Sequence, residues 1–367
     1  MADYNYGVGS LSTTAVSEKQ KQSLEHLTSG KTNYIVYSST LGWTIKPNGF
    51  ASDRYLANSK GIRANKEYSL LAAKNQIRIS SFGDSFTHCD DVKNEETWQQ
   101  QLNRANSNLE VINFGVGAFG LDQAFLRYKQ DGVHYNSDII FIGFMAENIF
   151  RNVNVFRPFY LPQDGLSLAK PRFIIKNDEL VLIKNPIQKL SQYKQLIAQP
   201  ELVLPKLGVH DHYFQTQSKQ HFIDSFSSFL PSIRLFKSFH YKLMNKNNII
   251  KHDEYNQESE AFQVTVKIFE EFRKSAIKHK SLPIIILFPS EADIMRYRDN
   301  KTKIYTPLLQ HFKEKNYPYI DIMDAFDKYG NNYGIRQLFK GHYSPLSNQL
   351  VAKYILEYLQ QQGLNKP

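Results

Sequence analysis

Four places in this sequence carry residues suited to acyl transfer. Ser85 follows a Gly-Asp pair, and His342 lies in a short polar run near the C-terminus. A serine hydroxyl with a histidine base is a nucleophile for ester carbonyls. The glycine-rich loop around Gly117 and the side chain of Asn148 are hydrogen-bond donors of the kind that stabilise an oxyanion. Together they predict nucleophilic catalysis by Ser85, with His342 as the base.

Each of these segments alone also fits an ordinary structural role. A Gly-Asp-Ser run is common in turns, where the serine caps a helix, and Asn148 fits a cap or turn position. The serine segment is not the Gly-x-Ser-x-Gly elbow, because position 87 is threonine. Three glycines between 115 and 120 match a dinucleotide-binding spacing. They follow the second predicted strand rather than the first, and no acid ends the next strand, which argues against that function.

Alternating apolar segments predict the elements that position these residues. Strands are expected at 77–82, 109–114, 138–143, 283–288 and 319–322, and helices near 95–104, 122–130, 257–280, 302–315 and 345–361. Asn94 is the expected cap of the first helix, and Ser344 with Pro345 is the expected start of the last. Residues 33–70 read as extended structure with turns, preceded by a loose tail or a peripheral helix.

This order predicts an α/β class fold: a three-layer α/β/α domain with a five-stranded parallel sheet. Residues 72–150 and 255–367 would form it, with an N-terminal extension at 1–71 and an insertion after the third strand at 151–254. Ligands of such sheets bind beyond the carboxyl ends of the strands. All four chemically interesting segments fall in loops at that edge.

The order of these segments resembles the SGNH (GDSL-like) hydrolase superfamily, in its esterase and O-acyltransferase branch. The matching blocks are Gly83-Asp84-Ser85-Phe86, Asn113 to Ala118, Gly143 to Asn148 and Gly341 to Pro345. The resemblance covers about 77–148 and 255–360 and implies the flavodoxin-like fold of that family. It also implies Ser85 as nucleophile, His342 as base, and an oxyanion hole formed by the Ser85 N–H, Gly117 or Ala118, and Asn148.

Two positions depart from the family pattern. Ala118 stands where glycine is usual, so Gly117 and Ala118 are joint candidates for the backbone donor. Phe339 stands where an aspartate commonly precedes the histidine by three residues. A backbone carbonyl or an acid from elsewhere would then orient His342, and Asp324 and Glu291 are the alternatives considered.

Composition limits the choice of partners. The chain has 367 residues and a formal net charge of +10, and 151–250 alone holds 14 Lys or Arg against six Asp or Glu. A basic insertion can attract an acidic glycan, or it can be a solvated face. Arg151, Arg157 and Tyr160 are expected to line a substrate groove there, with ordinary packing as the alternative. No basic and aromatic repeat indicates nucleic acid, and no apolar run is long enough for a membrane span.

Other reactive side chains favour structural readings. His88 competes as a base but is expected to point away from Ser85, and Cys89, the only cysteine, fits a small buried residue. His210 to His212, with His221, resembles a metal set without a well-spaced third ligand. Neither a metal nor a cofactor is therefore predicted. The single cysteine and the absence of a signal-like start favour the cytoplasm.

Three functions follow as alternatives. The first is a Ser–His carboxylic ester hydrolase that removes a small acyl group, such as an O-acetyl group on a carbohydrate. The second is an O-acyltransferase that modifies a bacterial polysaccharide through the same site. The third, suggested by Phe339 and Ala118, is a non-catalytic glycan-binding protein on a hydrolase scaffold.

Overall fold

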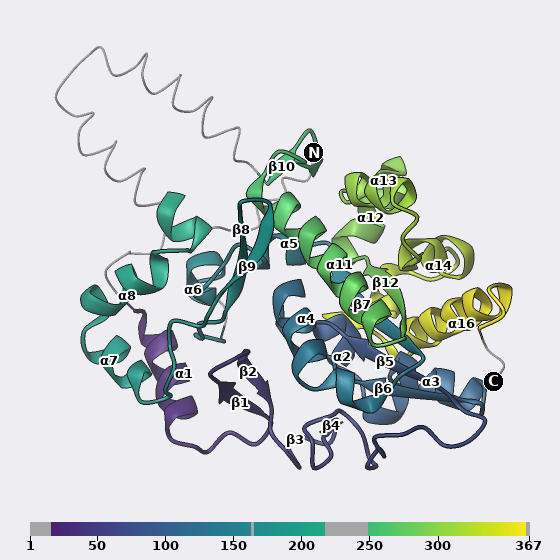
Figure 1. The fold of residues 1–367 in the computed structure, drawn as a ribbon, viewed down its shortest axis with the longest axis horizontal. Helices are drawn as coiled ribbons and strands as arrows, with labels where there is room; N and C mark the ends of the chain where they lie inside the picture. Colours follow the sequence, from purple (N-terminus) through teal and green to yellow (C-terminus); the bar gives the residue numbers. More distant parts are fainter. Residues whose placement is uncertain (1–15, 163–164, 217–248, 365–367) are drawn as a thin grey trace.

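The computed structural model describes residues 16–162, 165–216 and 249–364, and five parallel strands form its central sheet (Figure 1). The strand order is β13-β12-β7-β5-β6. The bounds are β5 Ile77–Phe82, β6 Leu109–Asn113, β7 Ile139–Met145, β12 Leu282–Phe288 and β13 Tyr319–Asp321. Every neighbouring pair is parallel. The predicted α/β/α class and five-stranded sheet are confirmed, with each strand end within two residues of its expected position.

Helices cover both faces of the sheet, so the central strands are apolar on both sides. All of β7 is buried. Its Ile140, Ile142 and Phe144 enter one core, whereas Ile139 and Phe141 enter the other, as the two-residue period of a strand requires. The first core is covered by α4 Leu121–Gln130 and α11 Glu260–Lys278, and the second by α3 Trp98–Ala105, α14 Ile322–Tyr329 and α16 Pro345–Gln361.

The helix starts test the capping expectations. Helix α16 begins at Pro345, and Ser344 caps it by accepting the Ser347 N–H, as predicted. The cap expected at Asn94 is wrong, because α3 begins at Trp98 with Thr97 as its cap. A short 3-10 turn at Asn94–Glu96 precedes α3. Helices α12 Glu291–Asn300 and α14 are among those that the sequence analysis did not predict.

The N-terminal segment and the insertion form smaller elements beside the sheet. Helix α1, Glu18–Thr28, packs on α7 of the insertion, Gln192–Ala198, as Figure 1 shows in purple and teal. The N-terminal strands are β1 Ile35–Ser38, β2 Gly42–Ile45, β3 Phe50–Ala51 and β4 Tyr55–Leu56, which form two hairpins. The insertion contains α5 Asn148–Arg151, α6 Arg157–Tyr160, β8 Arg172–Lys176, β9 Glu179–Ile183, α7 Gln192–Ala198, α8 Pro200–Gly208, β10 Ile250–Lys251 and β11 Glu254–Tyr255.

The remaining elements lie in the C-terminal half of the chain. They are α13 Thr306–Glu314, α15 Ile335–Leu338, and the hairpin of β14 Phe339–Lys340 with β15 His342–Tyr343. Within the described residues, no helix is both long enough and apolar enough to pass through a lipid bilayer.

Candidate active site

Ser85 is the first residue of α2, Ser85–His88, a single turn that follows β5. Asp84 caps this turn, because its carboxylate accepts the Phe86 N–H at 2.9 Å. The other carboxylate oxygen accepts the Asn148 side-chain amide at 3.0 Å. Burial raises the pKa of Asp84, an effect that Arg151 opposes. In the described part of the chain, neither the hydroxyl nor the backbone N–H of Ser85 has a hydrogen-bond partner.

Three glycines make room for α2 at the carboxyl edge of the sheet. A Cβ atom on Gly83 or Gly143 would lie 2.1 or 2.2 Å from the Thr87 hydroxyl oxygen. A Cβ atom on Gly115 would lie 2.2 Å from the His88 nitrogen. Such contacts are far closer than real Cβ atoms make, so the short turn can sit this low only because these positions lack side chains.

The glycine-rich loop forms a tight turn beside α2. The Phe119 N–H donates to the Val116 carbonyl at 3.3 Å, and the Val116 N–H donates to the Gly83 carbonyl at 3.0 Å. Ala118 has φ +66°, which is the left-handed conformation that the third position of a type II turn requires. The N–H groups of Gly117 and Ala118 have no acceptor among the described residues. Both predicted backbone donors are therefore available to a ligand.

His342 lies on β15, immediately after the tight bend at Gly341, which has φ +91°. Its Nδ1 is 2.8 Å from Oδ2 of Asp91. Its ring centre is 5.3 Å from that of Phe86, the neighbour of Ser85. His342 and Ser85 therefore lie at the same edge of the sheet, although no hydrogen bond joins them in the described chain. The side chain of His342 is 29% exposed, which leaves it open to a substrate.

The acid beside His342 was missed in the sequence. An acid from elsewhere does contact the ring, as one alternative predicted, but it is Asp91 and neither Asp324 nor Glu291. Asp324 instead pairs with Lys303 at 2.8 Å. One sequence signal could have identified Asp91: it lies in the same strand-end loop as Ser85, six residues after it.

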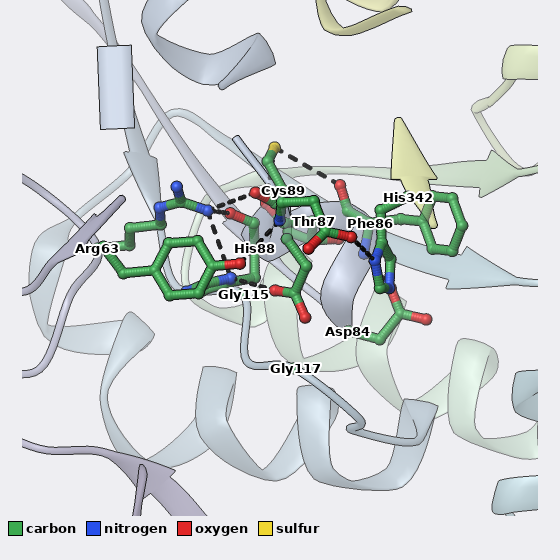
Figure 2. Close-up of polar contacts among 12 residues, drawn as sticks. Arg63, Asp84, Phe86, Thr87, His88, Cys89, Gly115, Gly117 and His342 are labelled. Atoms are coloured by element: carbon green, nitrogen blue, oxygen red, sulfur yellow. Dashed lines mark hydrogen bonds and ion pairs between the residues drawn. The ribbon is translucent and has the colours of Figure 1, made fainter. Parts of the chain in front are cut away.

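The loop that carries Asp91 is fixed by the N-terminal segment. The Asp91 N–H donates to the Tyr55 hydroxyl at 2.7 Å. The guanidinium of Arg63, which is buried, donates to the carbonyls of His88 and Cys89 (Figure 2). It also donates to the Val92 carbonyl. The N-terminal extension therefore holds the loop that carries Asp91 in place.

The His88 side chain lies against the N-terminal extension and points away from Ser85, as expected. It is buried, its Nδ1 contacts the Asp90 carboxylate, and its Nε2 is 2.6 Å from the Tyr34 hydroxyl. Burial, together with the charge of Arg63, lowers the pKa of His88 to about 4. The neighbouring Cys89 is also buried, which raises its thiol pKa to about 12, so it is a poor nucleophile.

The three side chains expected to line a substrate groove are buried. Arg151 and Arg157 are each 6% exposed and Tyr160 is 1% exposed. Arg151 Nη2 lies 3.2 Å from Glu147 Oε1, and the Tyr160 hydroxyl donates to the same oxygen at 2.9 Å. Burial by itself would raise the pKa of Glu147, but the two arginines hold it below its usual value. The alternative of ordinary packing describes these residues better than a groove.

Other cations of the insertion are also used internally. Lys170 pairs with Asp122, and Arg172 pairs with Glu260; both cations are buried. The charge count of the insertion therefore overstates the positive charge that its surface offers to an acidic glycan.

The metal-like run at 210–212 has a structural use. The Asp211 carboxylate accepts N–H groups from Val155, Phe156, Tyr213 and Phe214. His221 lies outside the described residues. In the part of the chain that the structure covers, no three His, Cys, Asp or Glu side chains are grouped closely enough to hold a metal ion.

Comparisons with known proteins give likenesses in structure alone. No family model and no curated protein sequence matches the chain. A member of the lipolytic G-D-S-L family from Veillonella parvula is similar at 14% identity, with 78% of this chain and 99% of that chain covered and a TM-score of 0.39.

Two further solved structures are similar to the same degree. An α/β hydrolase from the metagenome of Lake Arreo is 15% identical, with 81% and 99% of the two chains covered and a TM-score of 0.39. An acetylxylan esterase from Geobacillus stearothermophilus is 12% identical, with 78% and 95% covered and a TM-score of 0.38.

Proposed function

We propose that this protein is a serine-dependent carboxylic ester hydrolase that removes a small acyl group, such as an O-acetyl group on a carbohydrate. Ser85 would be the nucleophile, His342 the base and Asp91 the acid that orients it. The observation that carries the proposal is the 2.8 Å contact between His342 Nδ1 and Asp91, beside a serine at a helix start. This pairing supplies the acid that Phe339 cannot.

The mechanism follows from the positions of these groups. The Ser85 hydroxyl attacks the ester carbonyl carbon, and its proton passes to Nε2 of His342. When the carbon–oxygen bond of the ester breaks, His342 returns the proton to the leaving alcohol. Water then attacks the acyl-serine, again losing a proton to His342, and the carboxylic acid leaves with Ser85 restored. The Ser85 hydroxyl and Nε2 of His342 must come within hydrogen-bond distance when substrate binds. Catalytic hydrogen bonds are often long in enzymes without ligand and shorten in the substrate complex.

The oxyanion would be stabilised by donors that have no other partner. The backbone N–H groups of Ser85, Gly117 and Ala118 are unpaired in the described chain. Asn148 donates one amide hydrogen to Asp84 and keeps a second. Losing one oxyanion donor typically lowers turnover by about 10²–10³-fold.

The test compares the wild type with Ser85→Ala on p-nitrophenyl acetate. We expect the variant to fold normally and to lose burst and steady-state release of p-nitrophenol. Mass spectrometry of wild-type protein quenched during turnover should find the acyl group on the peptide that contains Ser85. Equal rates for the two proteins would refute the proposal.

Acyl transfer is the second candidate function, and one observation favours testing it. Ser85 is only 5% exposed, and a recessed acyl-serine is better shielded from bulk water than an open one. The same assay with an added neutral or acidic polysaccharide separates the two reactions. Acylated polysaccharide would indicate transfer, whereas acetate alone would indicate hydrolysis.

A further inference from the structure

Three consecutive carbonyls in the glycine loop accept hydrogen bonds from side chains outside the loop. The Trp43 indole donates to the Gly117 carbonyl at 3.0 Å. Arg157 donates to the Ala118 carbonyl at 3.3 Å, and Arg151 donates to the Phe119 carbonyl at 3.0 Å. Trp43 belongs to β2 in the N-terminal segment, whereas the two arginines belong to α6 and α5.

These bonds set the direction of the N–H groups on the other side of each peptide. In a trans peptide, the carbonyl and the following N–H point in opposite directions. The Gly117 carbonyl and the Ala118 N–H belong to one peptide, so the bond from Trp43 turns the Ala118 N–H away from Trp43. That N–H has no acceptor among the described residues.

Gly117 also lies close to Asp90, which follows α2. A Cβ atom on Gly117 would lie 3.1 Å from the Asp90 carboxylate, and the Asp90 N–H donates to the Ser85 carbonyl at 2.9 Å. Figure 2 shows Gly115 and Gly117 along the loop that runs past this turn. The inference below requires that an N–H directed away from Trp43 faces Ser85, and these contacts place the Ser85 turn next to the loop.

Trp43 itself is firmly held. Its side chain is 1% exposed, and its ring packs edge-on against Phe119 with centres 5.8 Å apart. Gly42, just before it, has φ +87°, and a Cβ atom there would lie 2.6 Å from the Ala169 carbonyl of the insertion. The β1–β2 hairpin therefore packs between the glycine loop and the insertion.

We propose that Trp43 and Arg157 are positioning residues for the oxyanion hole, which hold the Gly117–Ala118 turn so that the Ala118 N–H faces the acyl group on Ser85. This inference rests on the proposed function. It also assigns the backbone donor to Ala118, since Trp43 fixes the peptide to which that N–H belongs.

The test uses Trp43→Phe, which keeps an aromatic ring against Phe119 and removes the indole donor. Values of kcat/KM are measured for p-nitrophenyl acetate and for its thiono analogue, in which sulfur replaces the carbonyl oxygen. Sulfur accepts hydrogen bonds poorly, so the ratio of the two rates reports the oxyanion hole. We expect the oxygen ester to slow by about 10–10²-fold, with little change in KM, and the thiono ester to slow less.

A matched control is Tyr305→Phe. The Tyr305 hydroxyl is a buried donor to Asp321 at 2.9 Å, beside β13 at the other edge of the sheet. Its loss should lower stability without changing the oxygen-to-thiono ratio. A merely structural role of Trp43 predicts the same behaviour for Trp43→Phe, so a folded Trp43→Phe protein with the wild-type ratio would overturn the inference.

A second variant keeps the inference testable if Trp43→Phe does not fold. Arg157→Met leaves Trp43 in place and removes the hydrogen bond to the Ala118 carbonyl. Like Trp43→Phe, it should lower the ratio of kcat/KM for the oxygen ester to that for the thiono ester. An unchanged ratio in folded Arg157→Met would then overturn the inference. Ser85→Ala distinguishes failure of the proposed function from failure of this inference. If Ser85→Ala stays active, the proposed function is wrong. If Ser85→Ala is inactive but the oxygen-to-thiono ratios of the other two variants are unchanged, only the positioning role of Trp43 and Arg157 is wrong.

Discussion

Nδ1 of His342 lies 2.8 Å from Oδ2 of Asp91, although the two residues are 251 positions apart in the chain. The contact is possible because Gly341 has no side chain: a Cβ atom there would lie 2.9 Å from the same carboxylate oxygen. Asp91 has φ +70°, so the chain turns sharply after α2 and presents the carboxylate to the β14–β15 hairpin. The proposed nucleophile and the proposed acid thus share one loop, and the proposed base comes from another.

Asp91→Asn should lower kcat by roughly 10²–10⁴-fold with the fold intact, because an amide no longer stabilises the imidazolium or fixes the Nδ1–H tautomer. Asparagine has the same shape, so the tight fit against Gly341 is kept. Ester hydrolysis, with circular dichroism as the check on folding, measures the effect. Asp324→Asn is the matched control, since Asp324 is 51% exposed and pairs with Lys303, and it should keep wild-type activity. Full activity in Asp91→Asn would remove Asp91 from the mechanism.

Ala118→Gly should be at least as stable as the wild type and remain active. Ala118 has φ +66°, a conformation that costs an L-residue about 1–2 kcal/mol and glycine little. Part of that gain is offset by the freer unfolded chain. Ala118→Val should lose stability, because a β-branched side chain tolerates this conformation worst. Chemical denaturation measures the stability of both variants. A marked loss of stability in Ala118→Gly would contradict the claim that Ala118 is strained in its left-handed conformation.

The regular elements were predictable because their signals are local. The apolar runs of β7 and β12 and the cap of α16 at Ser344 are read directly from neighbouring residues. Ser85, His342 and the glycine loop were predicted as site residues from the same kind of local signal, since each follows a strand or precedes a helix.

The supporting residues were not predictable in the same way. The contact of Asp91 with His342, and that of Trp43 with Gly117, join segments far apart in the sequence. The partners of Arg151 and Arg157, which were expected to line a groove, were hidden for a related reason: Glu147 and the loop carbonyls pair with them inside the protein.

His88 should make stability depend on pH. Its pKa is lowered from 6.5 to about 4 in the folded protein, so the unfolded chain binds a proton more readily between these values. The contribution of neutral His88 to the free energy of unfolding is complete above about pH 6.5, where it amounts to about 3 kcal/mol at most. This contribution is lost as the pH falls through about 4. His88→Gln has no such titration. The difference in unfolding free energy between wild type and His88→Gln should therefore shrink from pH 7 to pH 4.5, and parallel pH curves would contradict the shift.

Gly143→Ala should destabilise the protein through its contact with Thr87. The added methyl group would meet the Thr87 hydroxyl oxygen at 2.2 Å, and overpacking of this kind typically costs about 1–3 kcal/mol. That hydroxyl is buried without a hydrogen-bond partner in the described chain, so Thr87→Ala alone loses little. The double variant should recover much of the loss, giving a coupling of about 1 kcal/mol or more in a double-mutant cycle measured by chemical denaturation. Strictly additive effects would mean that the position of α2, which begins at Ser85, does not depend on this gap.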